Sequence, residues 1–147
     1  MKKGTEMHEL TNGAALPSVA ALSYLGDARH SLFIRRMLVE RGLTKAADLN
    51  RESLRYVTAE AQAKAYRKIE HLLLDDERAV FKRAQNSTHL NKPKHASGAD
   101  YRLASGFEAV IGMLEWLGDR ERLEMLLTAA HTEDNTITGD KENDSEN

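Results

Sequence analysis

Two carboxylates interrupt stretches of the chain that are otherwise apolar. Asp27 directly follows Gly26 and lies between the apolar residues 19–22 and 32–34, and Glu108 lies within a second apolar run. A buried carboxylate is unfavourable unless a cation or a metal ion pairs with it. A glycine inside a helix costs about 1 kcal/mol relative to alanine. Because the sequence accepts both costs in these runs, Asp27 and Glu108 are the first candidates for a functional site.

Two helices that each carry an inward carboxylate beside a glycine can cross closely enough to bring the carboxylates together. Gly26 lies in the first run, and Gly106 and Gly112 flank Glu108 in the second. Adjacent carboxylates repel each other and favour a cation between them. The chain has no cysteine, so the natural ion is one that prefers oxygen ligands, Mg²⁺, with Mn²⁺ as an alternative. Such an ion orients water and stabilises charge on phosphate oxygens, which indicates phosphodiester cleavage.

Simpler interpretations of the same residues are open. An arginine such as Arg29 or Arg102 can neutralise Asp27 without forming a site. Ser23 and Ser105 lie near the two carboxylates, but no histidine stands in the sequence where it would activate either hydroxyl, so we expect small packing residues there. The histidines show no metal-ligand spacing, and none is followed by aspartate, which argues against a histidine–aspartate phosphohydrolase.

The elements that must position these residues are helices. Apolar residues recur at intervals of three and four through most of the chain, Gly42 and Gly118 stand at helix ends, and Thr44 is an expected N-cap. Alternating apolar and polar residues are absent, so no strand is expected. The predicted fold class is all-α, with helices at about 18–40, 45–50, 53–74, 77–84, 99–117 and 121–130 and a long loop over 86–97.

Length and charge indicate one domain with two polar ends. The 147 residues suit a single domain, which we place at 16–131, after a flexible N-terminal segment 1–15. Residues 132–147 carry six acids and one base, and read as a disordered acidic tail, whereas the rest of the chain has a net charge of +3. No run reaches the ~18 apolar residues of a membrane span, and the lack of cysteine fits a reducing compartment, so a cytoplasmic location is expected.

A basic segment precedes Glu108. Between residues 78 and 102 there are six Lys and Arg residues and one acid, Asp100. These bases lie on or beside the expected long loop, where they are either a solvated surface or contacts to phosphate. A mildly basic body with an exposed basic loop permits a nucleic-acid partner without requiring one.

Two motifs give the chain a family resemblance. Tyr-Leu-Gly-Asp-Ala at 24–28 and Gly-Phe-Glu-Ala-Val-Ile-Gly at 106–112 resemble the ribonuclease III catalytic domain, most nearly its Mini-III branch, which consists of this domain alone. Lys-Arg-Ala-Gln-Asn at 82–86 resembles the Arg-Gly-Arg-Asn stretch of that branch, and Pro93-Lys94 and Tyr101-Arg102 follow in the same order. The resemblance covers about residues 16–128.

The resemblance implies a ribonuclease III endonuclease-domain-like helical fold and a function. The expected enzyme is a Mg²⁺-dependent endoribonuclease that acts as a homodimer on double-stranded RNA and leaves 5′-phosphate and 3′-hydroxyl ends. Its substrate in this branch is the 23S ribosomal RNA precursor, or the large ribosomal subunit that contains it. Asp27 and Glu108 are implied as catalytic residues and as ligands of the metal, directly or through water. The implied RNA-binding residues are Lys82, Arg83, Asn86, Lys92, Lys94 and Arg102.

The chain also departs from the pattern of larger ribonuclease III proteins. Ser23 and Ser105 stand where those proteins carry a Glu and an Asp, so two of four carboxylates are missing and the number of metal ions is open. Only a short acidic tail follows the expected domain, so the catalytic body must hold the RNA. One rival is a catalytically silent relative that binds RNA or the ribosome. Another is a helical metal-dependent enzyme that acts on a different phosphate ester.

Overall fold

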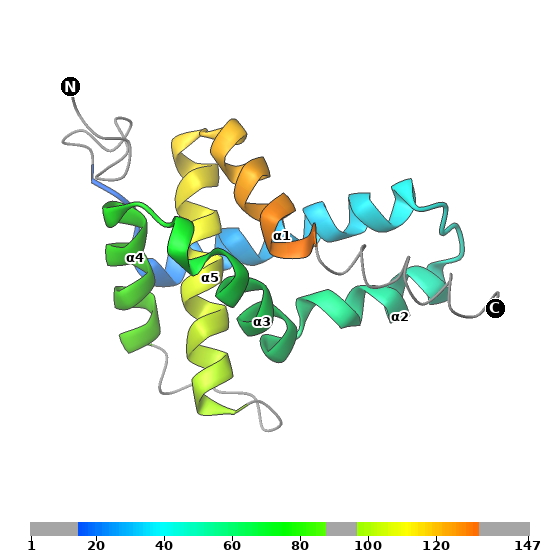
Figure 1. The fold of residues 1–147 in the computed structure, drawn as a ribbon, viewed down its shortest axis with the longest axis horizontal. Helices are drawn as coiled ribbons and strands as arrows, with labels where there is room; N and C mark the ends of the chain where they lie inside the picture. Colours follow the sequence, from blue (N-terminus) through cyan, green and yellow to red (C-terminus); the bar gives the residue numbers. More distant parts are fainter. Residues whose placement is uncertain (1–14, 88–96, 133–147) are drawn as a thin grey trace.

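The computed structural model describes residues 15–87 and 97–132, and within these ranges every regular element is a helix. In chain order the elements are α1 (Val19–Glu40), α2 (Ala46–Val57), α3 (Ala59–Ile69), the 3-10 turn η2 (Glu70–Leu72), α4 (Asp75–Asn86), α5 (Gly98–Leu117) and a last helix over residues 120–132 (Figure 1). The predicted all-α fold class is confirmed. The predicted terminal segments 1–15 and 132–147 lie, apart from residues 15 and 132, outside the described residues. Among the helices described, none is long and apolar enough to cross a membrane.

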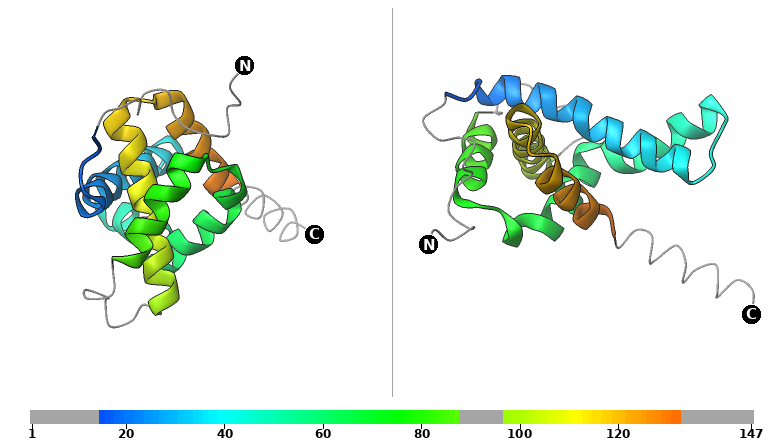
Figure 2. Two further views of the ribbon diagram at one scale, coloured as in Figure 1. Left: turned by 90° about the vertical axis from the view of Figure 1, so that its left-hand side faces the viewer. Right: turned by 90° about the horizontal axis from the view of Figure 1, so that it is seen from above.

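α5 is the central helix of the fold. It packs against α1, α3 and α4, and the right-hand view of Figure 2 shows it nearly end-on beneath the N-terminal half of α1. Every residue from 104 to 114 is buried except Glu108, which is partly exposed. Phe107 and Leu114 join a core cluster with Leu123 and Leu127 of the last helix. Because neighbours surround this part of α5, residues 104–114 are mostly apolar, and Glu108 is the charged residue among them.

The boundary between α2 and α3 differs from the prediction. The sequence pattern placed a break near residues 51–52, whereas α2 continues to Val57 and the chain turns at Thr58. Thr58 has extended backbone angles, and its hydroxyl accepts a hydrogen bond from the Ala61 amide at 3.2 Å, so it is the N-cap of α3. Lys45, not Thr44, occupies the N-cap position of α2. The apolar spacing continues across Thr58, which is why the break was misplaced.

A buried ion pair ties the last helix to α4. The Arg122 guanidinium donates to both carboxylate oxygens of Glu77, at 2.6 and 2.8 Å, and to the Leu72 carbonyl at 2.7 Å. Glu77 is fully buried and also accepts a hydrogen bond from the Leu74 amide at the start of α4. Because its charge is paired and hydrogen-bonded on all sides, Glu77 is tolerated in the interior. The sequence analysis did not find this pair.

Two glycines let the backbones of α1 and α5 touch. A Cβ atom built on Gly26 would lie 1.7 Å from the carbonyl oxygen of Glu108, and one built on Gly112 would lie 1.9 Å from the carbonyl oxygen of Leu22. Only glycine fits at either position. Gly106 serves another neighbour, since a Cβ there would meet the Phe81 ring of α4 at 2.3 Å. The predicted glycine-lined crossing of the two helices is therefore present.

Replacing Gly112 with alanine is expected to lower the free energy of unfolding by at least about 2 kcal/mol, because the new methyl group overlaps rigid backbone of α1. Gly98→Ala is the matched control on the same helix. Its methyl group would meet only the flexible end of the Arg102 side chain, at 3.3 Å, so it should be neutral or stabilising by up to about 1 kcal/mol. Urea denaturation measures both, and equal stability of the two variants would contradict the account.

Candidate active site

The crossing of α1 and α5 brings Asp27 and Glu108 together. Gly26 lies against the Glu108 carbonyl, so the next residue of α1, Asp27, lies beside the Glu108 side chain. The two carboxyl groups are close enough that the negative charge of Asp27 raises the pKa of Glu108. Asp27 is exposed and Glu108 is partly buried. The structure thus juxtaposes the two predicted carboxylates, which stand 81 positions apart in the sequence; their catalytic and metal-binding roles stay predictions.

Both carboxylates line an open cleft of about 370 Å³. Its wall is made by small and aromatic side chains from α1 and α5, together with the residue that ends α4. The lining residues are Val19, Ala20, Ser23, Tyr24, Asp27, Ser87, Tyr101, Ser105 and Glu108. A cleft lined this way leaves Asp27 and Glu108 accessible from solvent.

The electrostatics of the pair favour a bound cation. Burial raises the pKa of Glu108 to about 8, and the negative charge of Asp27 acts in the same direction. A hydrogen bond from Gln62 opposes them. Without a cation, Glu108 therefore gives up its proton less readily than an ordinary glutamate. A divalent ion that displaces this proton would remove the repulsion between the two carboxylates.

The donor set fits Mg²⁺. Within the described ranges no group of three or more His, Asp or Glu residues is placed to hold a metal ion. The carboxylates that line the cleft are those of Asp27 and Glu108. Mg²⁺ is commonly held by one or two carboxylates and keeps several water ligands. Two carboxyl oxygens from facing helices at an open cleft meet this requirement.

The two nearby serines contact each other. The Ser23 hydroxyl donates a hydrogen bond to the backbone carbonyl of Ser105 at 3.0 Å, and Ser105 is buried. These side chains add small polar surface to the cleft and no negative charge. They strengthen the contact between α1 and α5, in keeping with the packing role expected from the sequence.

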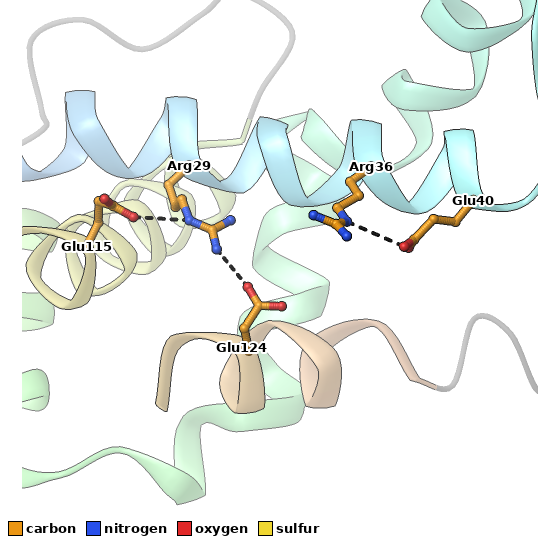
Figure 3. A network of polar contacts seen from close by, with 5 residues as sticks. All are labelled: Arg29, Arg36, Glu40, Glu115 and Glu124. Atoms are coloured by element: carbon orange, nitrogen blue, oxygen red, sulfur yellow. Dashed lines mark hydrogen bonds and ion pairs between the residues drawn. The ribbon is translucent and has the colours of Figure 1, made fainter. Parts of the chain in front are cut away.

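Arg29 does not neutralise Asp27. Its guanidinium binds Glu115 of α5 at 3.1 Å and Glu124 of the last helix at 2.7 Å (Figure 3). These partners lie on the side of α1 that faces the last helix. Arg102, the other arginine considered, is exposed near the start of α5.

Gln62 of α3 also reaches the site, and the sequence analysis missed it. Its side-chain amide donates to Glu108 Oε2 at 3.2 Å and to the Val57 carbonyl at 3.0 Å. The residue is 2% exposed. A signal was present, because Ala65, Tyr66 and Ile69 follow Gln62 at helical spacing and share its buried face. A polar residue that begins such a stripe needs a polar partner.

Four of the six predicted RNA-binding residues lie within the described ranges. Lys82, Arg83 and Asn86 are exposed at the C-terminal end of α4, and Arg102 is exposed in the first turns of α5. Ser87 and Tyr101, which adjoin Asn86 and Arg102 in the sequence, line the cleft that holds the two carboxylates, whereas Arg83 lines a separate pocket with Leu16 and Pro17. The other two predicted residues, Lys92 and Lys94, lie outside the described residues.

Comparison with known proteins agrees with the fold and the site. A family model described as the ribonuclease III domain matches residues 20–119. Proteins called Mini-ribonuclease 3 from Symbiobacterium thermophilum and Streptococcus pneumoniae are each 41% identical to this chain, over 82% and 74% of its length and 92% and 86% of theirs. The crystal structure of protein FN1578 from Fusobacterium nucleatum superposes with a TM-score of 0.71 at 28% identity, covering 78% of this chain and 87% of that one.

The fold and the family match define a ribonuclease III domain. Within that class, the identity and coverage of these relatives show that the chain belongs to the Mini-ribonuclease 3 family. The resemblance seen in the sequence and the expected class of enzyme, an endoribonuclease, are confirmed.

Because the folded state raises the pKa of Glu108 from its ordinary 4.5 to about 8, it holds that proton more tightly than the unfolded chain does. In EDTA, the wild type should therefore lose stability as pH rises from about 5 through 8, by roughly 2–4 kcal/mol relative to Glu108→Gln, which has no proton to lose. Urea denaturation across this range measures the difference. Parallel pH profiles for the two proteins would contradict the assigned coupling.

Proposed function

We propose that this protein cleaves double-stranded, structured RNA in a Mg²⁺-dependent reaction, with Asp27 and Glu108 as metal ligands and catalytic residues. The observation that supports the proposal most is that the contact between α1 and α5 brings the carboxyl groups of Asp27 and Glu108 together at an accessible cleft. Membership in the Mini-ribonuclease 3 family supplies the substrate class. The proposed products carry 5′-phosphate and 3′-hydroxyl ends.

Each part of the site has a distinct task in this reaction. Asp27 and Glu108 present oxygen ligands from two helices, and the small side chains of Ser23 and Ser105 leave room beside them for a phosphate group. When bound, the metal ion supplies positive charge for the phosphate oxygens and an activated water. The rigid contact between α1 and α5 holds the carboxylates in place, so little reorganisation is needed when substrate binds.

The proposed RNA surface begins at the end of α4. Lys82, Arg83, Asn86 and Arg102 are exposed, Asn86 and Arg102 adjoin in the sequence residues that line the cleft, and Lys92 and Lys94 complete the proposed set. Duplex RNA is recognised by its shape and by contacts to phosphates and 2′-hydroxyls, so weak sequence preference is expected. Binding through phosphates also predicts strong dependence on salt.

A homodimer is part of the proposal. Tyr24, three residues before Asp27 on α1, is 85% exposed, and Leu32 on the same helix is 57% exposed. Large apolar side chains exposed along one helix are typical of a protein–protein contact. Two copies joined near Tyr24 would present two sites, one for each strand of a duplex. We further propose that the natural RNA is the 23S ribosomal RNA precursor and that the protein works in the cytoplasm.

Incubation with long double-stranded RNA, single-stranded RNA or double-stranded DNA, in Mg²⁺ or in EDTA, tests the proposal. Only double-stranded RNA should be cut, and only with the metal. Asp27→Asn and Glu108→Gln should each lower the cleavage rate by at least about 10²-fold, because each removes a ligand of an ion on which the chemistry depends.

Glu115→Gln is the matched control, since it neutralises a carboxylate of α5 that pairs with Arg29 and lies outside the cleft; its activity should match the wild type. Reversal of the charges at Lys82 and Arg83 should raise KM and reduce its salt dependence. RNA binding without cutting in Mg²⁺ or Mn²⁺ would overturn the proposal. It would favour the rival, a silent RNA- or ribosome-binding relative, which the lack of carboxylates at Ser23 and Ser105 permits.

A further inference from the structure

Gln62 is the one buried polar side chain of α3. Its amide contacts the carboxylate of Glu108. Its amide nitrogen is shared between Glu108 Oε2, at 3.2 Å, and the carbonyl oxygen of Val57, at 3.0 Å. Both neighbours accept hydrogen bonds, so the amide must present its NH₂ group to them and its orientation is settled. Gln62 thus links the end of α2 to the site on α5.

This contact restricts a side chain that would otherwise turn. The last torsion of a glutamate is broad and roughly two-fold, so an unheld carboxylate samples a wide range of orientations. The hydrogen bond from Gln62 holds Oε2 from the protein side, while Asp27 contacts the carboxyl group from α1. The hydrogen bond to the Val57 carbonyl fixes the Gln62 amide in turn. The amide therefore stays in place if the Glu108 carboxylate rotates.

The arrangement carries a local cost. The other amide atom, Gln62 Oε1, is buried and has no hydrogen-bond partner in the part of the chain that the structure describes. A buried acceptor left without a partner is destabilising. A leucine or methionine at this position would fill the same space on α3 without that cost, so the amide is better explained by what it does for Glu108 than by packing.

We propose that Gln62 is a positioning residue that fixes the carboxylate of Glu108 in the orientation needed to bind the divalent ion. The inference rests on the proposed metal site. The Ser23 hydroxyl is bonded to the backbone carbonyl of Ser105. Among the described residues, the hydrogen-bond geometry gives the Glu108 carboxylate one side-chain hydrogen bond, the one from Gln62. Residues that orient a metal ligand through a hydrogen bond commonly affect metal affinity as strongly as 10–100-fold.

Gln62→Met tests this role, because it keeps the length of the side chain and removes the donor. Electron paramagnetic resonance of free Mn²⁺ gives the Mn²⁺ affinity of the full chain without RNA and without turnover. We expect Gln62→Met to weaken Mn²⁺ binding about tenfold. In the cleavage assay it should lower kcat while KM for RNA stays unchanged, since Gln62 does not line the cleft.

Thr58→Ala is the matched control. Thr58 caps the first turn of α3, one turn before Gln62, and its hydroxyl bonds to the Ala61 amide rather than to Glu108. It should loosen the same turn and leave Mn²⁺ affinity unchanged. Gln62→Asn is a second variant should methionine fail to fold; its shorter amide cannot keep both bonds, so it should weaken Mn²⁺ binding likewise.

Combination with Glu108→Gln separates the two proposals. If Gln62 acts through Glu108, then Gln62→Met should cause no further loss of Mn²⁺ affinity once Glu108 is already replaced. Wild-type affinity in Gln62→Met, or an equal loss in the Glu108→Gln background, would overturn the positioning role while leaving the metal site intact. If Mn²⁺ binds the wild type and Glu108→Gln equally, or binds neither, the metal site itself is refuted, and the role of Gln62 with it.

Discussion

The close contact between the backbones of α1 and α5 is the constraint on which the rest of the structure depends. It is reciprocal, since Gly26 lies against the carbonyl of Glu108 and Gly112 lies against the carbonyl of Leu22. These two contacts fix the position of α1 along α5 and the rotation of each helix about its own axis. Because Asp27 follows Gly26 and Glu108 supplies the opposing carbonyl, the same contact places both carboxylates side by side. Packing and site therefore share one set of residues.

The other elements hold the core around α5 together, partly through buried polar side chains. The ring of Phe81 fits over Gly106, the Glu77–Arg122 pair joins α4 to the last helix, and buried His30 and His131 bring their Nε2 atoms within 3.1 Å. Burial lowers the pKa of His30 to about 3, so this histidine stays neutral in the core. At the site, burial and the negative charge of Asp27 together raise the pKa of Glu108. A cation bound between the two carboxylates would offset their repulsion.

Local signals in the sequence were enough for the fold class and for the pair of carboxylates. Asp27 directly follows a glycine in one apolar run, Glu108 has glycines two and four positions away in another, and helical spacing marks α1 and α5. The end of α2 and the role of Gln62 depend instead on contacts between distant residues, since Gln62 meets Glu108 46 positions away. Neighbouring residues of a helix face directions about 100° apart, so packing against α5 decides whether Ala61 or Gln62 faces the core.

The most direct test of the account is to locate the metal ion. Crystals of the wild-type protein soaked in Mn²⁺ would show it by anomalous scattering, independently of activity. The account predicts a peak between the carboxylates of Asp27 and Glu108, at the crossing of α1 and α5, and its loss in Glu108→Gln. A peak bound elsewhere in the protein, or an undisturbed peak in Glu108→Gln, would contradict the claim that this crossing builds the active site.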